Sequence, residues 1–167
     1  TLELNSPKVK KRLPKSLTEE EIDQLLTAPP KDGTPKALRD KALLTMLYAT
    51  GMRVTEVVSL CVSDVNLNEG AVYCYSQGDR PRRLPLTERA FQALASYVKD
   101  GRPELLRDPD ELALFLNHRG ERLTRQGLWL IIKVYAKEAG LEEDVTPHTL
   151  RHSFAAHKIS EGTELRE

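Results

Sequence analysis

One stretch decides how this chain folds: Ala49-Thr50-Gly51-Met52-Arg53-Val54-Thr55-Glu56. A long helical pattern of apolar residues ends at Gly51, and a glycine there stops a helix because it adopts a left-handed conformation at little cost. Arg53 then stands at the junction with a second short helix, and Glu56 lies one turn further along, where its carboxylate can hold the guanidinium. The same residues also fit an exposed ion pair without a function.

A second cluster lies near the other end of the sequence, at Thr146-Pro147-His148-Thr149-Leu150-Arg151-His152-Ser153-Phe154-Ala155. His148 and Arg151 stand three positions apart, so both side chains leave a helix on the same side. The imidazole can move a proton near neutral pH, and the guanidinium is a permanent, planar phosphate clamp. Together with Arg53 they could stabilise a pentacoordinate phosphorane without a metal. Taken alone, His148 fits a helix cap equally well, and Arg151 fits a surface base.

The composition predicts one globular domain. Of the 167 residues, 40% are apolar and 30% are charged, which is ordinary for a chain that buries its own core. No apolar run is long enough to cross a bilayer, so we expect no membrane association. The two cysteines, Cys61 and Cys74, lack the spacing of metal ligands and predict reduced thiols. We therefore expect a cytoplasmic protein with neither metal nor cofactor.

Charge is distributed unevenly along the sequence, although the formal net charge is zero. Basic residues gather at 8–12 and at Arg80, Arg82, Arg83 and Arg89, and acidic residues gather at 19–23, 104–111 and 142–144. A fold that presented the basic segments on one face would suit DNA. A mixed solvated surface gives the same counts, so charge alone leaves both interpretations open.

Periodicity and turn signals predict a mainly α fold with a small three-stranded antiparallel β-sheet (α+β). Helices are expected at 18–27, 37–51, 54–60, 87–99, 124–140 and from 147 to about 162, the first opened by a capping box of Thr18 and Glu21. Strands at 65–67, 71–75 and 82–86 flank two turns. Residues 100–111 are expected to form an acidic loop, and the Pro-containing, basic residues 1–16 a linker before the folded domain.

The two clusters, with the basic hairpin between them that ends Arg83-Leu84-Pro85-Leu86, closely resemble the catalytic domain of tyrosine recombinases, in the Xer and phage-integrase branch. The resemblance runs from residue 17 to the end of the sequence. It implies the DNA breaking-rejoining fold, with 17–167 as a catalytic domain lacking its C-terminal helices and 1–16 as the linker from a missing N-terminal core-binding domain. It also implies double-stranded DNA as the partner and a dimer or tetramer of the full-length parent on paired half-sites.

The activity implied by the resemblance is site-specific DNA recombination or integration through a 3'-phosphotyrosyl intermediate, which needs neither ATP nor metal. By the same resemblance, Arg53 and Arg151 bind the non-bridging phosphate oxygens, His148 handles protons and Glu56 supports Arg53. The expected DNA-binding residues are Arg80, Arg82, Arg83 and Arg125. Such a protein would work on the nucleoid of a bacterium or on phage DNA.

Two departures from the family pattern bear on cleavage. Gln77 stands where the family carries a general-acid lysine between the second and third strands, and no lysine occurs between Lys41 and Lys99. The nucleophilic tyrosine that should follow the His148 motif is absent from the chain. The tyrosines present all lie upstream, in core-like or strand positions, and are Tyr48, Tyr73, Tyr75, Tyr97 and Tyr135. We therefore expect this chain to bind DNA without cutting it.

Three other functions fit part of the pattern. A non-catalytic DNA-binding relic of the same fold would explain Gln77. A type IB topoisomerase shares the phosphotyrosyl chemistry but relaxes strands without exchanging partners. A helical interaction module with no role on DNA would require the three ordered motifs to coincide.

Overall fold

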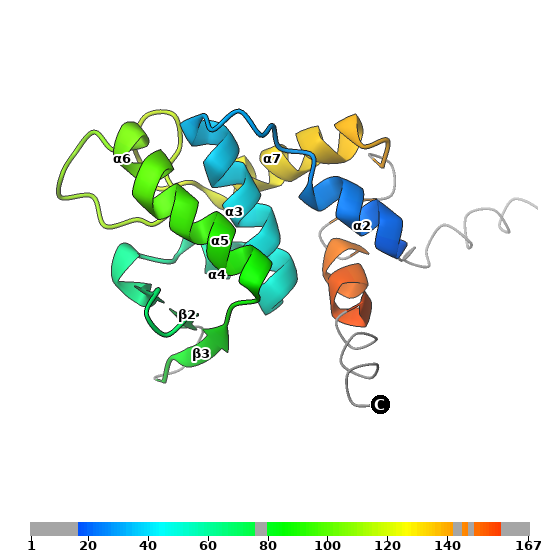
Figure 1. Cartoon of the computed structure of the whole chain (residues 1–167), viewed down its shortest axis with the longest axis horizontal. Helices are drawn as coiled ribbons and strands as arrows, with labels where there is room; N and C mark the ends of the chain where they lie inside the picture. Colours follow the sequence, from blue (N-terminus) through cyan, green and yellow to red (C-terminus); the bar gives the residue numbers. More distant parts are fainter. Residues whose placement is uncertain (1–16, 76–79, 142–144, 147–148, 158–167) are drawn as a thin grey trace, which may run out of the picture.

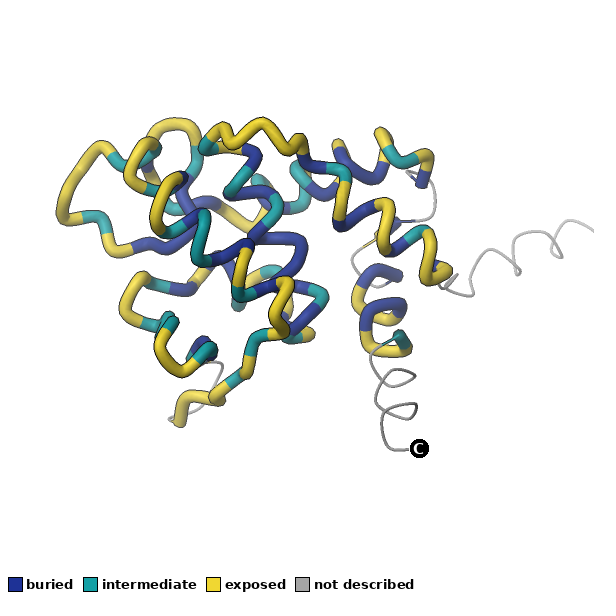
Figure 2. Tube along the Cα trace, viewed as in Figure 1, coloured by how far each residue is buried: buried dark blue, intermediate teal, exposed yellow. Residues whose placement is uncertain are grey.

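In the computed structural model, helix α3 (Pro35–Thr50) forms the buried centre of the fold and packs against α5 (Glu88–Ser96), as Figures 1 and 2 show. Thr34 caps its start by accepting a hydrogen bond from the Ala37 amide. Gly51 ends it in the predicted left-handed conformation, with φ 72°. Along the described part of the chain, no helix is both long and apolar enough to span a bilayer.

Shorter helices surround α3 in the residues that the structure describes, which are 17–75, 80–141, 145–146 and 149–157. They are α2 (Glu19–Leu26), α4 (Val54–Val58), the 3-10 turn η2 (Val62–Asp64), α5, the π-helical turn η3 (Tyr97–Gly101), α6 (Arg102–Leu105), α7 (Arg125–Glu138) and the helical residues 149–157. The predicted capping box opens α2, because the Thr18 amide donates to Glu21 Oε1 at 2.9 Å and the Glu21 amide donates to Thr18 Oγ1 at 3.1 Å. The helices predicted from periodicity are thus confirmed where they are described.

The sheet has the predicted three antiparallel strands, β1 (Val65–Asn66), β2 (Ala71–Cys74) and β3 (Arg82–Pro85), in that order. Val72 pairs with Leu84, and Tyr73 pairs with Arg83. Because neighbouring residues of a strand alternate between faces, Val72 and Cys74 share the face toward the core, where both are buried. The turn between β2 and β3, with Gln77, lies outside the described residues.

The prediction of an acidic loop at 100–111 is wrong for its first residues, because helical backbone continues through η3 and α6 to Leu105. Gly101 and the following proline would ordinarily end a helix. Here the proline occupies the first turn of α6. A Cβ on Gly101 would lie 2.9 Å from Tyr97 Cδ1 and 3.2 Å from Leu38 Cβ, so the glycine permits a close approach to α3.

A buried polar network ties α3 to α7. Arg39 Nη2 pairs with Asp40 Oδ1 at 2.8 Å, and Arg39 Nη1 donates to the Leu116 carbonyl at 3.1 Å. The Tyr135 hydroxyl donates to Asp40 Oδ2 at 2.5 Å. Burial and then the Asp40 carboxylate raise the pKa of Tyr135 well above its usual range. The buried Arg39–Asp40 pair is therefore hydrogen-bonded both to the Leu116 carbonyl and to Tyr135 of α7.

We expect Tyr135→Phe to lower the free energy of unfolding by about 1–3 kcal/mol, because it leaves one oxygen of the buried Asp40 without its donor. Urea denaturation followed by circular dichroism measures the change. Tyr73→Phe is the matched control, since the Tyr73 hydroxyl bonds the exposed side of Glu69, and its cost should stay within about 0.5 kcal/mol. Equal losses in the two variants would contradict a special role for the buried network.

Candidate functional site

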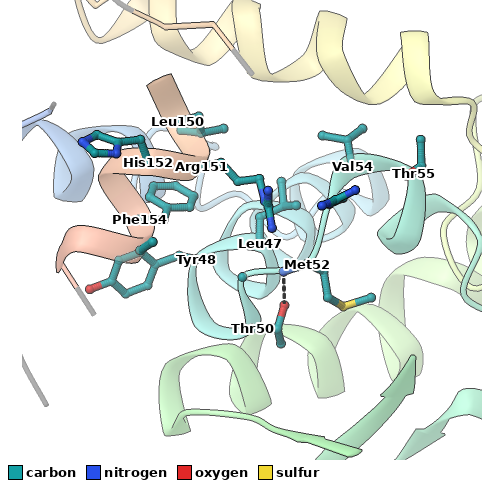
Figure 3. A pocket seen from close by; sticks show the side chains of 13 residues that line it. Leu47, Tyr48, Thr50, Met52, Val54, Thr55, Leu150, Arg151, His152 and Phe154 are labelled. Carbon is teal, nitrogen blue, oxygen red and sulfur yellow. Dashed lines mark hydrogen bonds between the residues drawn. The ribbon is translucent and has the colours of Figure 1, made fainter. Parts of the chain in front are cut away.

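The turn after α3 fixes the position of Arg53. The Thr50 hydroxyl donates to the Met46 carbonyl at 2.7 Å and accepts a hydrogen bond from the Met52 amide at 3.2 Å, which Figure 3 marks with a dashed line. The Met52 side chain is buried and anchors the turn, whereas Arg53 is exposed. Arg53 is the N-cap residue of α4, so its side chain leaves the fold at a rigid corner between two helices.

Glu56 does not hold the Arg53 guanidinium, which corrects the pairing expected from the sequence. Its Oε1 accepts a hydrogen bond from the backbone amide of Arg53 at 2.8 Å, and its Oε2 pairs with Arg82 Nη2 at 3.3 Å. The reason is local: Glu56 is the third residue of α4, and a glutamate there turns back to the open amide at the helix start. Glu56 therefore fixes the backbone of Arg53 and the side chain of Arg82.

Arg151 comes from the helical residues 149–157, which pack onto the end of α3 through the buried Leu150 and Phe154. Figure 3 shows the Arg151 side chain reaching from that helix toward Met52, while His152 leaves the helix on another side. Arg53 and Arg151 both line a hollow of about 700 Å³ at this junction. The structure thus brings together two arginines that lie far apart in the sequence.

Further contacts hold the helix that carries Arg151 in place. The buried Ser153 hydroxyl accepts a hydrogen bond from the Leu17 amide at 2.8 Å. His157 Nε2 contacts Glu19 Oε2 at 2.8 Å, and its Nδ1 contacts the Tyr48 hydroxyl. These links to α2 and α3 were not foreseen from the sequence, because nothing local to His157 indicates which distant helices it meets.

A second hollow, of about 590 Å³, extends the site to the sheet and is lined by Arg53, Arg82, Arg151 and Tyr75. Neither Arg53 nor Arg151 forms an ion pair or hydrogen bond through its guanidinium with another described residue. Arg82 is paired only with Glu56 among the carboxylates described, and its side chain remains 54% exposed. The hollow therefore carries more positive than negative charge, and planar guanidinium groups are well suited to bind phosphate oxygens.

The other predicted DNA-binding residues do not line this hollow. Arg83 pairs with Glu69 at 3.3 Å, on the strand face opposite to Cys74, and Arg80 is exposed just before β3. Arg125 begins α7 and borders a separate hollow of about 560 Å³ with Val54, the residue after Arg53. Both His148 and Gln77 lie outside the described residues.

Tyr75 is the lining residue that the sequence assignment missed. It was expected in a strand or core-like position, but β2 ends at Cys74 and the Tyr75 side chain is 59% exposed. The sequence did carry a signal for this, because Tyr75 lies only two residues before Gln77, where the turn begins.

The neighbouring Cys74 is buried, and burial raises the pKa of its thiol, although Arg82 lies 3.6 Å from the sulfur. Among the described residues, no group of histidines, cysteines and carboxylates is arranged to hold a metal ion.

Comparisons with known proteins agree on one family. Residues 15–167 match the model of the phage integrase family. The chain is 50% identical over 167 residues to tyrosine recombinase XerC of Herpetosiphon aurantiacus, covering 100% of this chain and 54% of that protein. It is 44% identical to tyrosine recombinase XerD of Halalkalibacterium halodurans over 166 residues, covering 99% of this chain and 55% of that one. The chain thus spans about half the length of these relatives.

Solved structures show the same fold. XerA recombinase aligns with a TM-score of 0.77 and 32% identity, covering 92% of this chain and 54% of that chain. The XerH recombinase bound to its difH substrate aligns with a TM-score of 0.71 and 26% identity, over 89% of this chain and 44% of that chain. The lambda integrase catalytic core, at 20% identity and a TM-score of 0.59, covers 84% of this chain and 81% of that chain and supports the fold alone. The chain therefore belongs to the phage integrase family, and its relatives are the Xer tyrosine recombinases.

Proposed function

We propose that this chain is the catalytic-domain segment of a longer site-specific recombinase, which cleaves and rejoins double-stranded DNA through a phosphotyrosyl intermediate. The observation that carries the proposal is the hollow where Arg53 and Arg151 meet without a carboxylate partner among the described residues. A pair of unneutralised guanidinium groups in one hollow can bind both non-bridging oxygens of a phosphodiester. The XerH structure contains bound DNA substrate, which supports DNA as the partner here.

In this mechanism the arginines supply charge and His148 handles protons. As attack proceeds, negative charge builds on the non-bridging oxygens, and two fixed guanidinium groups stabilise it more than they stabilise the ground state. The attacking tyrosine hydroxyl would come from a segment outside this chain and would give its proton to His148. Glu56 contributes indirectly, because it fixes the Arg53 backbone and directs Arg82 to the hollow. The complete recombinase would act as a dimer or tetramer on paired half-sites.

A non-catalytic DNA-binding protein is the second candidate, and Gln77 is the observation that favours it. An amide can donate a hydrogen bond to a phosphate but cannot release a proton at useful pH. Binding would then survive while cleavage was lost. The covalent intermediate therefore separates the two candidates, whereas DNA affinity alone does not.

We expect Arg53→Ala and Arg151→Ala each to weaken binding of a short DNA duplex by about tenfold or more, because each removes a charge-assisted contact to a phosphate. Fluorescence anisotropy at low salt measures the affinity, and circular dichroism checks that the variants fold. Arg119→Ala is the matched control: Arg119 is exposed and lines neither hollow, so its affinity should match that of the unaltered chain. If Arg53→Ala or Arg151→Ala unfolds the chain, the substituted arginine stabilises the fold and is not assigned to phosphate binding.

Binding should also depend on salt. If the three arginines of the second hollow neutralise about three phosphates, affinity should fall about 40-fold between roughly 50 mM and 200 mM monovalent salt. A titration series across that range gives the slope of log affinity against log salt. A flat slope would contradict the assignment of these three arginines to DNA binding.

The covalent intermediate is tested with the full-length protein and a nicked suicide DNA substrate, analysed on a denaturing gel. We expect a protein–DNA band that disappears when the tyrosine downstream of the His148 motif is changed to phenylalanine. If the band forms only after Gln77→Lys, the site is intact but its proton donor has been lost. No band in either protein would reject the recombinase and leave the DNA-binding relic.

A further inference from the structure

The proposed cleavage leaves one chemical requirement without an assigned residue. When the scissile phosphodiester is attacked, the bond from phosphorus to the 5'-oxygen breaks, and that oxygen leaves far more easily if it receives a proton. The guanidinium groups of Arg53, Arg82 and Arg151 stabilise charge but do not give up protons in proteins. Gln77 has no acidic proton either. A proton donor must therefore come from elsewhere in the site.

Tyr75 is placed to meet this requirement. It lines the same hollow of about 590 Å³ as Arg53, Arg82 and Arg151, directly after the end of β2. Its side chain is 59% exposed, so a DNA phosphate that enters the hollow can approach the hydroxyl without rearrangement of the core. In model peptides a phenol and a lysine ammonium both lose their proton near pH 10, so the two groups have comparable strength as acids.

The other tyrosines are committed to structural contacts. Their hydroxyls bond His157 Nδ1 (Tyr48), Glu69 Oε1 at 2.6 Å (Tyr73), the Leu114 carbonyl at 2.8 Å (Tyr97) and Asp40 Oδ2 at 2.5 Å (Tyr135). Within the described ranges the Tyr75 hydroxyl has no such partner. Of the five tyrosines in the chain, Tyr75 is thus the one that lines the hollow with the arginines and has no hydroxyl partner among the described residues.

We propose that Tyr75 is the proton donor to the leaving 5'-oxygen, an assignment that rests on the proposed recombinase function. The attacking tyrosine oxygen forms a bond to phosphorus, the bond from phosphorus to the 5'-oxygen breaks, and the Tyr75 hydroxyl proton moves to that oxygen. The resulting Tyr75 phenolate is stabilised by the guanidinium groups that share the hollow. In rejoining, the phenolate takes the proton back from the attacking 5'-hydroxyl, so the cycle consumes no acid.

The test compares two suicide substrates in the full-length protein, one ordinary and one whose bridging 5'-oxygen at the cleavage site is replaced by sulfur. A thiolate leaves without being protonated, so a variant that lacks only the proton donor is rescued by sulfur. We expect Tyr75→Phe to slow formation of the covalent band about 100-fold or more on the ordinary substrate and to leave the rate on the sulfur substrate unchanged. Adding Gln77→Lys to Tyr75→Phe should restore cleavage of the ordinary substrate.

Tyr73→Phe is the matched control, because it removes a hydroxyl only two residues from Tyr75. The Tyr73 hydroxyl bonds Glu69 and does not line the hollow. This variant should cleave both substrates at the unaltered rate. Equal slowing of both substrates by Tyr75→Phe would overturn the proposal and make Tyr75 a DNA contact, and no slowing of either would exclude it from the reaction. If the unaltered protein forms no covalent band on either substrate, the recombinase function itself fails, which is a distinct result.

Discussion

The left-handed turn at Gly51 is the constraint on which the site depends. It ends α3 with φ 72° and allows the chain to begin α4 only three residues later, so that Arg53 caps α4 at a fixed corner. The Thr50 hydroxyl and the buried Met52 side chain secure that corner from both sides. A residue with a Cβ would be strained at this φ, and a longer, looser turn would let the guanidinium move away from Arg151. The backbone geometry at Gly51 thus fixes where the Arg53 side chain leaves the fold.

The arginines of this protein differ in whether the fold already uses their guanidinium groups, so a chain of zero net charge can still leave positive charge exposed in one place. Arg39, Arg102 and Arg122 donate to backbone carbonyls: Arg102 Nε to Ala113 at 2.9 Å, and Arg122 Nη1 to Val58 at 2.7 Å. Those guanidinium groups bind the loops together and are unavailable to a ligand. Arg53 and Arg151 make no comparable contact among the described residues. Local distribution, rather than total charge, decides what the surface can bind.

Much of the fold could be predicted because its signals are local. Capping residues such as Thr18 and the stop at Gly51 act within one helical turn, and the strand pattern around Gly70 fixes a hairpin. The predictions that failed concern features that depend on contacts between distant segments. At Gly101, the last residue of η3, α3 lies close enough to exclude a side chain, and Glu56 of α4 pairs with Arg82 of β3. The exposure of Tyr75 likewise follows from where β2 ends, which no periodicity in the sequence marks.

The proposed reaction makes two demands that a lysine at position 77 would meet together. Lysine contributes a charge to bind phosphate and a proton for the leaving oxygen, whereas glutamine contributes neither. The charge can be replaced, because Arg82 reaches the hollow and is held there by Glu56. The proton cannot come from any guanidinium, so it must come from a group of another kind. In the proposed reaction, a hollow with three arginines and one unpartnered phenol among the described residues would therefore divide the work of one lysine between two side chains, one for binding and one for proton transfer.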